Sequence, residues 1–205
     1  MIWIYDEPSN IQSSDNSNSY HRILVDESQE NHAFTVQYGI KVFKDNQLLA
    51  SALVLSTGEN LEVSKEIVLI DDDNIIICSG TSMFSIALPS LEKNWVLSVG
   101  QELCIAVYAN KVGFIVCGRN SISKITRKSE ILWVIQVPDI FVTEPRSKSL
   151  TLNKKYIAFA DVDGGAYKID YDGKLIEYRQ DAAPATGKLI QIRANRRSWW
   201  KFWRI

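Results

Sequence analysis

The chain has 205 residues, of which 46% are hydrophobic and 23% charged, so it can bury one sizeable core. Its net charge of −1 is unevenly spread, because residues 184–205 carry six basic residues and no acidic one, which leaves −1 − 6 = −7 for residues 1–183. No basic leader starts the sequence and no apolar run is long enough to cross a bilayer, so we expect no secretion signal or membrane helix and predict a soluble, cytoplasmic protein.

The N-terminal part of the chain predicts strands and almost no helix. Strand-like runs cover residues 2–5, 22–26, 33–43 and 48–55, with a turn at 44–47 between the last two. Residues 8–20 are rich in serine and asparagine, and they predict a flexible loop because so polar a stretch cannot offset its ordering entropy. We therefore predict a single all-β domain at 1–183, followed by a basic aromatic tail at 184–205.

Three groups of short apolar segments follow, each broken by turn-forming residues. The first group has segments at 66–70, 75–79, 83–88 and 94–99, and the second at 104–108, 112–117, 122–126 and 131–137. The third group runs from 150 to 178, where Asp163-Gly164-Gly165 and Asp172-Gly173 are strong hairpin signals because glycine accepts a positive φ. Each group predicts a four-stranded meander.

The groups are copies of one another by position. Cys78 and Cys117 are 39 residues apart, Trp95 and Trp133 are 38 apart, and Ile125 and Ile169 are 44 apart. Residues 40–49 also match 167–176 at a spacing of 127. The sequence thus contains three clear copies and one eroded copy of a unit of about 40 residues.

A repeat of about 40 residues with four short strands is typical of a β-propeller blade, because one meander cannot cover both of its faces. We predict a small β-propeller-like array of about four four-stranded antiparallel meander blades, with a β-sandwich as the alternative. Either residues 2–5 or Leu189–Arg193 complete the outer strand of a blade, or a second chain covers the opening.

The units resemble the blades of WD-type and quinoprotein-type propeller repeats over residues 30–180. Trp95 and Trp133 stand at the place of the late-strand tryptophan, and residues 156–161 through 173–176 are similar to the quinoprotein-type unit. No Gly-His or Trp-Asp dipeptide occurs, Glu177 stands where a tryptophan is expected, and Asp170 is one residue too close to Gly173. The resemblance implies the fold and no cofactor.

The sequence contains no recognisable catalytic or cofactor motif. His21 and His32 do not form a metal or nucleophile–base pair and are predicted to be solvated or to cap backbone groups. The three cysteines, Cys78, Cys104 and Cys117, lie in apolar runs without metal-type spacing and are predicted to be buried free thiols. We expect no enzyme activity, no cofactor and no metal.

Two kinds of binding residue are predicted. Hairpin loops form the binding face of repeat folds. We therefore predict as binding residues the acidic residues of two such turns, Asp71, Asp72, Asp73, Asp161 and Asp163. The last two, with Asp170, also suggest calcium-loop chemistry, but the spacing favours hairpin turns. The basic aromatic tail adds Arg196, Arg197, Trp199, Trp200, Lys201, Trp203 and Arg204. This tail either docks on the acidic body, which we favour, or binds a membrane surface or nucleic acid.

The sequence therefore favours a non-enzymatic protein–protein interaction module. A sharper hypothesis is a bacterial immunity-type protein, whose acidic surface blocks the basic cleft of a nucleic-acid-degrading toxin. The alternatives are a membrane- or nucleic-acid-associated adaptor that uses the tail, and a small hydrolase or sugar-binding propeller. A homo-oligomer would also cover an open blade face.

Overall fold

The computed structural model of the chain describes residues 1–7, 19–29, 33–99, 103–137, 150–161, 165–180 and 190–193, with the backbone alone for 180 and 190–193. It divides into two compact units, Met1–Gly118 and Arg119–Ile205, which are described separately. The predicted domain boundary at 183, residues 8–18 of the predicted loop and the C-terminal tail from 194 lie outside the described ranges.

Almost every element is a β-strand, as the alternating apolar pattern predicts. The first unit contains β1 (Ile2–Asp6), β2 (Arg22–Val25), the 3-10 helix η1 (Glu27–Gln29), β3 (Val36–Lys44), β4 (Gln47–Ser56), β5 (Val68–Asp71), β6 (Asn74–Ser79), β7 (Ser82–Ala87), β8 (Lys93–Ser98), β9 (Cys104–Ala109) and β10 (Gly113–Gly118). The second contains β11 (Ser121–Thr126), β12 (Ile131–Gln136), β13 (Leu150–Leu152), β14 (Ile157–Ala160), β15 (Gly165–Ile169), β16 (Leu175–Gln180) and β17 (Ile190–Arg193). None of the described segments is a helix able to cross a bilayer.

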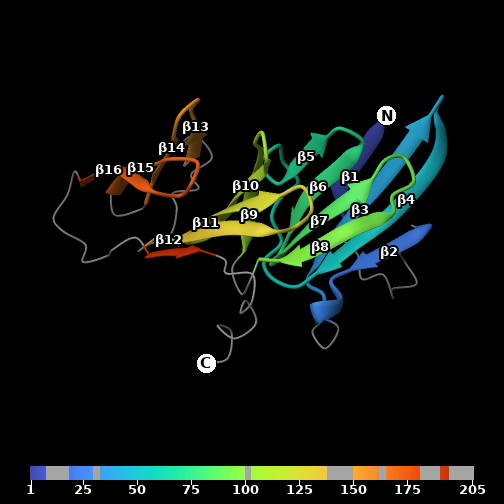
Figure 1. The fold of residues 1–205 in the computed structure, drawn as a ribbon. Helices are drawn as coiled ribbons and strands as arrows, with labels where there is room; N and C mark the ends of the chain where they lie inside the picture. The colour runs from blue at the N-terminus through green and yellow to red at the C-terminus, as the bar shows by residue number, and fades with distance from the viewer. Residues whose placement is uncertain are drawn as a thin grey trace. The chain divides into compact units, whose positions relative to one another are not determined.

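The predicted meanders are present. Strands β5 to β8 pair in chain order and antiparallel, and so do β13 to β16 (Figure 1). Residues 104–137 form the antiparallel hairpins β9–β10 and β11–β12. In a β-sandwich the chain crosses between two facing sheets. Here, strands that are consecutive in sequence pair with each other, as they do in propeller blades. The predicted all-β, propeller-like class is confirmed.

The repeats share one irregularity that proves their common register. The last strand pair of each repeat has a β-bulge, between Ser85 and Ile86, between Lys124 and Ile125, and between Lys168 and Ile169. The spacings between these bulges are 39 and 44 residues, the same values that the sequence alignment predicts. Because a bulge adds twist at a defined point, its recurrence means that the sheets have equivalent shapes.

The two repeat tryptophans share one feature, since each contacts the repeat that follows it in sequence. Trp95 on β8 packs against Phe114 on β10, with ring centroids 6.4 Å apart. Trp133 on β12 donates a hydrogen bond of 3.1 Å from Nε1 to the carbonyl oxygen of Tyr171, in the β15–β16 turn. Each tryptophan therefore links its own meander to the next one in sequence, by a ring contact for Trp95 and by a hydrogen bond for Trp133.

The first sheet departs from the predicted antiparallel meander. Its order is β1-β3-β4-β2, and β2 runs parallel to β4. The β3–β4 hairpin turns at Asp45 and Asn46, whose φ values of 50° and 64° suit a two-residue turn. Strands β1 and β2 precede the β3–β4 hairpin in sequence and flank it on opposite sides, so the chain crosses from one edge of the sheet to the other between them.

Both segments predicted to complete a blade are edge strands. In the first unit β1 pairs antiparallel with β3, and in the second unit β17 pairs antiparallel with β12, with Trp133 opposite Arg193.

The cores lie between strands of alternating or continuous apolar sequence. The largest fully buried side chains are Tyr38, Phe84, Phe114, Ile40, Leu53, Ile67, Ile75, Ile76, Ile77, Met83 and Ile86.

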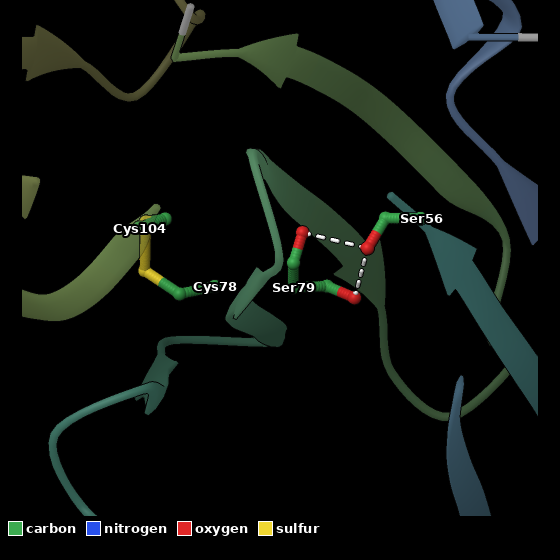
Figure 2. The surroundings of a disulfide bond; sticks show 4 residues. All are labelled: Ser56, Cys78, Ser79 and Cys104. Atoms are coloured by element: carbon green, nitrogen blue, oxygen red, sulfur yellow. Dashed lines mark hydrogen bonds between the residues drawn. A yellow bond between two sulfur atoms is a disulfide. The ribbon is translucent and has the colours of Figure 1, made fainter. Parts of the chain in front are cut away.

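The prediction of three free thiols was wrong for two of them. Cys78 on β6 and Cys104 on β9 form a disulfide, with their Cα atoms 5.3 Å apart (Figure 2). These strands belong to successive repeats, and residues 26 positions apart meet because the sheets pack against each other. Cys117 is a free, buried thiol as predicted, and burial raises its pKa to about 12.

Candidate functional site

A buried polar junction joins the first two sheets of the first unit. Asp26, which follows β2, accepts hydrogen bonds of 3.0 and 2.6 Å from the backbone and hydroxyl of Ser28 and one of 2.7 Å from Ser82 on β7. The Gln29 amide donates to Thr81 at 2.8 Å and accepts from Thr57 at 2.7 Å. Nearly all of its polar atoms are used internally, so this junction is structural.

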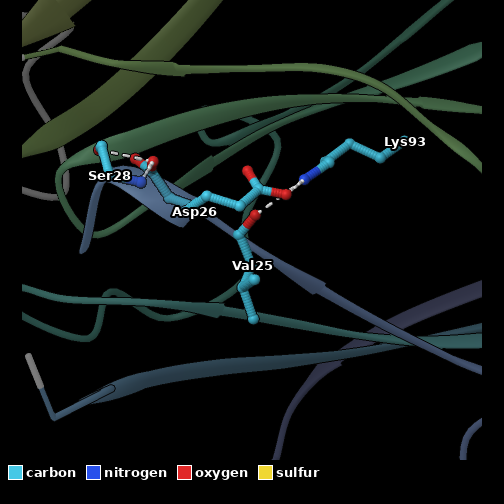
Figure 3. A network of polar contacts seen from close by, with 5 residues as sticks. Val25, Asp26, Ser28 and Lys93 are labelled. Atoms are coloured by element: carbon cyan, nitrogen blue, oxygen red, sulfur yellow. Dashed lines mark hydrogen bonds and ion pairs between the residues drawn. The ribbon is translucent and has the colours of Figure 1, made fainter. Parts of the chain in front are cut away.

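The outer rim of the same junction carries ion pairs. Lys93 on β8 donates to the carbonyl oxygen of Val25 at 3.1 Å and forms an ion pair with Glu27, next to the Asp26–Ser28 turn (Figure 3). Arg22 pairs with Glu92 at 3.2 Å on the surface. Exposed pairs contribute little to stability, so these two are minor contacts at the edge of the junction.

A second cluster of polar groups lies beside β1. The hydroxyl groups of Tyr5 and Tyr20 are 2.8 Å apart, and Tyr20 donates to the carboxylate of Glu7. Burial and the bond to Glu7 raise the pKa of Tyr20 above its ordinary value, so this hydroxyl stays protonated at neutral pH. A Cβ atom at Gly39 would lie 2.4 Å from the Tyr5 ring, which explains the glycine in β3.

The end of the first sheet exposes a group of large apolar side chains, which we call the β1 patch. Trp3 is 51% exposed and packs on Phe43 of β3, with ring centroids 4.8 Å apart. The patch consists of Ile2, Trp3, Leu48 and Leu49. Exposed apolar side chains at the end of a sheet are available for contact with a protein partner.

The predicted acidic turn Asp71–Asp73 is the β5–β6 hairpin turn. Asp72 and Asp73 are exposed, and Asp72 has a φ of 51°. The Asp73 carbonyl oxygen accepts a 2.7 Å hydrogen bond from the backbone of Leu88. Across the described residues, no three histidine, cysteine or acidic side chains group to hold a metal ion. The turn therefore offers an anionic surface.

Asp161 is buried rather than placed on a hairpin surface, since only 4% of it is exposed. Its carboxylate accepts hydrogen bonds of 2.7 Å from the Gly165 backbone and from the Tyr167 hydroxyl. Burial and the Asp161 contact raise the pKa of Tyr167, which keeps the hydroxyl a donor. Asp161 thus closes the β14–β15 hairpin, in agreement with the turn interpretation, and each of its carboxylate oxygens accepts a hydrogen bond within it.

We expect Asp161→Ala to lower the free energy of unfolding by about 2–4 kcal/mol, because it leaves a buried amide and a buried hydroxyl without acceptors. Urea denaturation measures this loss. Asp170→Ala is the matched control, because Asp170 also accepts two backbone hydrogen bonds, from Asp172 and Lys174, but is partly exposed. Equal losses in both variants would contradict the buried role of Asp161.

The remaining predicted site residues fall outside the described ranges. These are Asp163, His32, Arg196, Arg197, Trp199, Trp200, Lys201, Trp203 and Arg204. His21 is described, and its Nδ1 accepts a 3.2 Å hydrogen bond from the backbone of Ser51 on β4. The β1 patch was not among the predicted sites, because its apolar residues lie in strand-like runs whose exposure the sequence does not show.

Two solved structures are similar to part of this chain. BamB from Moraxella catarrhalis matches with a TM-score of 0.48 and 14% identity, over 73% of this chain and 45% of that one. The Pan2 WD40 domain from Neurospora crassa matches with a TM-score of 0.43 and 13% identity, over 56% of this chain and 37% of that domain. The chain spans less than half the length of either structure. No family model and no curated protein matches the sequence.

Proposed function

We propose that the chain is a non-enzymatic protein–protein interaction module. The observation that carries this proposal is the β1 patch, where four large apolar side chains are each at least 36% exposed on one end of the first sheet. Burying such side chains in a partner is favourable by about 25 cal/mol per Å² of apolar area. The patch lies on strands that are already paired, which lowers the ordering cost of binding.

The charge distribution favours a sharper version, in which the partner is basic. Residues 1–183 carry a net charge of −7, and the exposed Asp72 and Asp73 add an anionic turn. A bacterial immunity-type protein that neutralises a nucleic-acid-degrading toxin would use such a surface. The basic aromatic sequence of residues 193–205 supports the second candidate, an adaptor at a membrane surface or nucleic acid.

Affinity capture from the source cell tests the interaction function. We expect the tagged chain to retain a stoichiometric protein partner, and we expect Trp3→Ser with Leu48→Ser to lower the affinity of the purified pair at least about tenfold. Ile176→Ser is the matched control, because Ile176 is 57% exposed on β16 of the second unit. Absence of any complex at micromolar concentration would contradict the proposal.

A further inference from the structure

Strand β1 is an edge strand with free backbone groups. The pair Met1–Phe43 exchanges both backbone hydrogen bonds, at 2.8 and 2.9 Å, and Glu7 donates to Gln37 at 2.9 Å. Antiparallel pairing alternates, so odd-numbered residues of β1 bond to β3 and even-numbered ones point away from it. In the described structure the outward N–H and C=O groups of Ile2, Ile4 and Asp6 are therefore free to pair with another strand.

The sequence of β1 does little to protect this edge. Natural proteins block exposed edges with lysine, proline or bulges, but Ile2–Asp6 reads Ile-Trp-Ile-Tyr-Asp and pairs with β3 without interruption. The edge strand β16 of the second unit, by contrast, carries the charged Glu177 and Arg179. The apolar side chains of β1 that belong to the β1 patch, Ile2 and Trp3, lie on its two opposite faces.

The end of β1 carries an unsatisfied acceptor. Oδ1 of Asp6 is buried and has no hydrogen-bond partner in the described structure. Asp6 lies opposite Tyr38 in the β1–β3 register, and burial, with a smaller contribution from the charge of Asp6, raises the pKa of the Tyr38 hydroxyl to about 12. A buried acceptor without a partner is destabilising, so a donor arriving beside it is favoured.

We propose that β1 binds an extended segment of a partner protein, which adds to the first sheet as a further antiparallel strand. The partner strand bonds to the backbone of Ile2, Ile4 and Asp6, places apolar side chains opposite the two isoleucines and places a lysine or arginine opposite Asp6. This inference rests on the proposed interaction function and names its partner class.

The same residues argue against a second copy of β1 as the occupant. In any antiparallel pairing of two β1 strands through their free edges, the residue opposite Asp6 is drawn from the outward set Ile2, Ile4 and Asp6. None of these side chains is a hydrogen-bond donor when Asp6 is ionised. The buried oxygen would stay unsatisfied, so a basic partner strand fits and a copy does not.

A synthetic peptide tests the proposal on the full chain. The probe is fluorescein-labelled Thr-Lys-Thr-Val-Thr-Val-Thr-amide, which aligns its lysine with Asp6 and its valines with Ile4 and Ile2. We expect submillimolar binding by fluorescence polarisation, and at least about tenfold weaker binding of the same peptide with glutamate in place of lysine. Absence of binding by the lysine peptide at millimolar concentration would overturn the proposal.

Two variants locate the binding to the edge. Ile4→Pro removes one outward N–H group without touching a β1–β3 hydrogen bond, and we expect it to weaken binding at least about tenfold, while Ile4→Val binds as the unchanged chain does. Asp6→Asn should reduce the preference for the lysine peptide to below about threefold. Thermal melting checks that each variant folds. If Ile4→Pro does not fold, the lysine preference of Asp6→Asn tests the proposed strand addition.

The outcomes separate this inference from the broader function. If the captured partner and the peptide bind Ile4→Pro as tightly as Ile4→Val, strand addition at β1 is wrong and the interaction function stands. If the peptide binds as expected and no partner is captured from the source cell, the edge is competent and the broader function fails. An unchanged lysine preference in Asp6→Asn would overturn the proposed strand addition, because the lysine would then not be recognised by Asp6.

Discussion

Gly80→Ala is expected to lower the free energy of unfolding by more than about 3 kcal/mol. Gly80 lies in the β6–β7 turn with a φ of 54°, and a Cβ atom there would stand 1.9 Å from the carbonyl oxygen of Thr57. That oxygen already accepts a 2.9 Å hydrogen bond from Thr81. The backbone must move to admit a methyl group, so the polar junction between the first two sheets would open.

Gly58→Ala is the matched control for this position. Gly58 has a φ of 118°, and its added Cβ would meet Gly80 Cα at 3.2 Å, so it carries conformational strain without a backbone collision under 3 Å. We expect a loss of about 1–2 kcal/mol by urea denaturation. Gly80→Ala with a loss no larger than that of Gly58→Ala would mean that the turn does not pack on Thr57 as described.

Cys104→Ala is expected to cost about 3.5 kcal/mol of stability, the loop-closure contribution of a disulfide that spans 26 residues. Adding a reductant should destabilise the unchanged chain by a similar amount and leave Cys104→Ala unaffected. Cys117→Ala, at a buried free thiol, should keep the full response to reductant. Equal stability of the unchanged chain with and without reductant would contradict the disulfide.

Thiol counting checks the same feature independently. Denatured without reductant, the chain should react with one equivalent of iodoacetamide, at Cys117, and with three after reduction. In the native state Cys117 should react slowly at pH 8, because burial raises its pKa to about 12 and leaves little thiolate. Disulfides are typical of oxidising compartments, so one reactive thiol in the freshly extracted chain would argue against the predicted cytoplasmic location.

The repeated part of the fold was predictable because its signals are local. Alternating apolar segments and glycine or aspartate turns specify short antiparallel strands without information from distant residues. The sequence did not predict any β-bulge. The bulges, at Lys124 and Lys168 among others, nevertheless recur at the predicted repeat spacings of 39 and 44 residues. Glu177, which replaces the expected tryptophan, lies opposite Lys168 in the β15–β16 register and pairs with it at 2.7 Å.

The features that the sequence did not reveal depend on contacts between distant segments. Strand β2 lies parallel to β4 because the chain must cross the first sheet, and no local pattern encodes that crossing. The disulfide follows from the approach of β6 and β9, which only the packing of successive sheets sets. Asp161 looked like a surface turn residue, but it is buried and bonded to Tyr167, whose ring stacks on Phe159 of the neighbouring strand.

The candidate site was predicted less well than the fold. Acidic turns and the basic tail stand out in a sequence because charge is visible there, and Asp72 and Asp73 are indeed exposed. The β1 patch is made of apolar residues, which the sequence analysis assigned to strands and cores. Whether Trp3 is buried or exposed depends on which sheets cover β1, and that depends on the order of strands.

The pairing of β17 with β12 has a consequence for biosynthesis. Residues 137–189 separate the two strands, so the ribosome must make the whole of β13 to β16 before β12 receives its last neighbour. At about 5–20 residues per second this takes roughly 3–10 s, during which the nascent chain presents an open strand. A premature stop codon after β16 would make that exposure permanent, and such a product should be a target for chaperones and proteases.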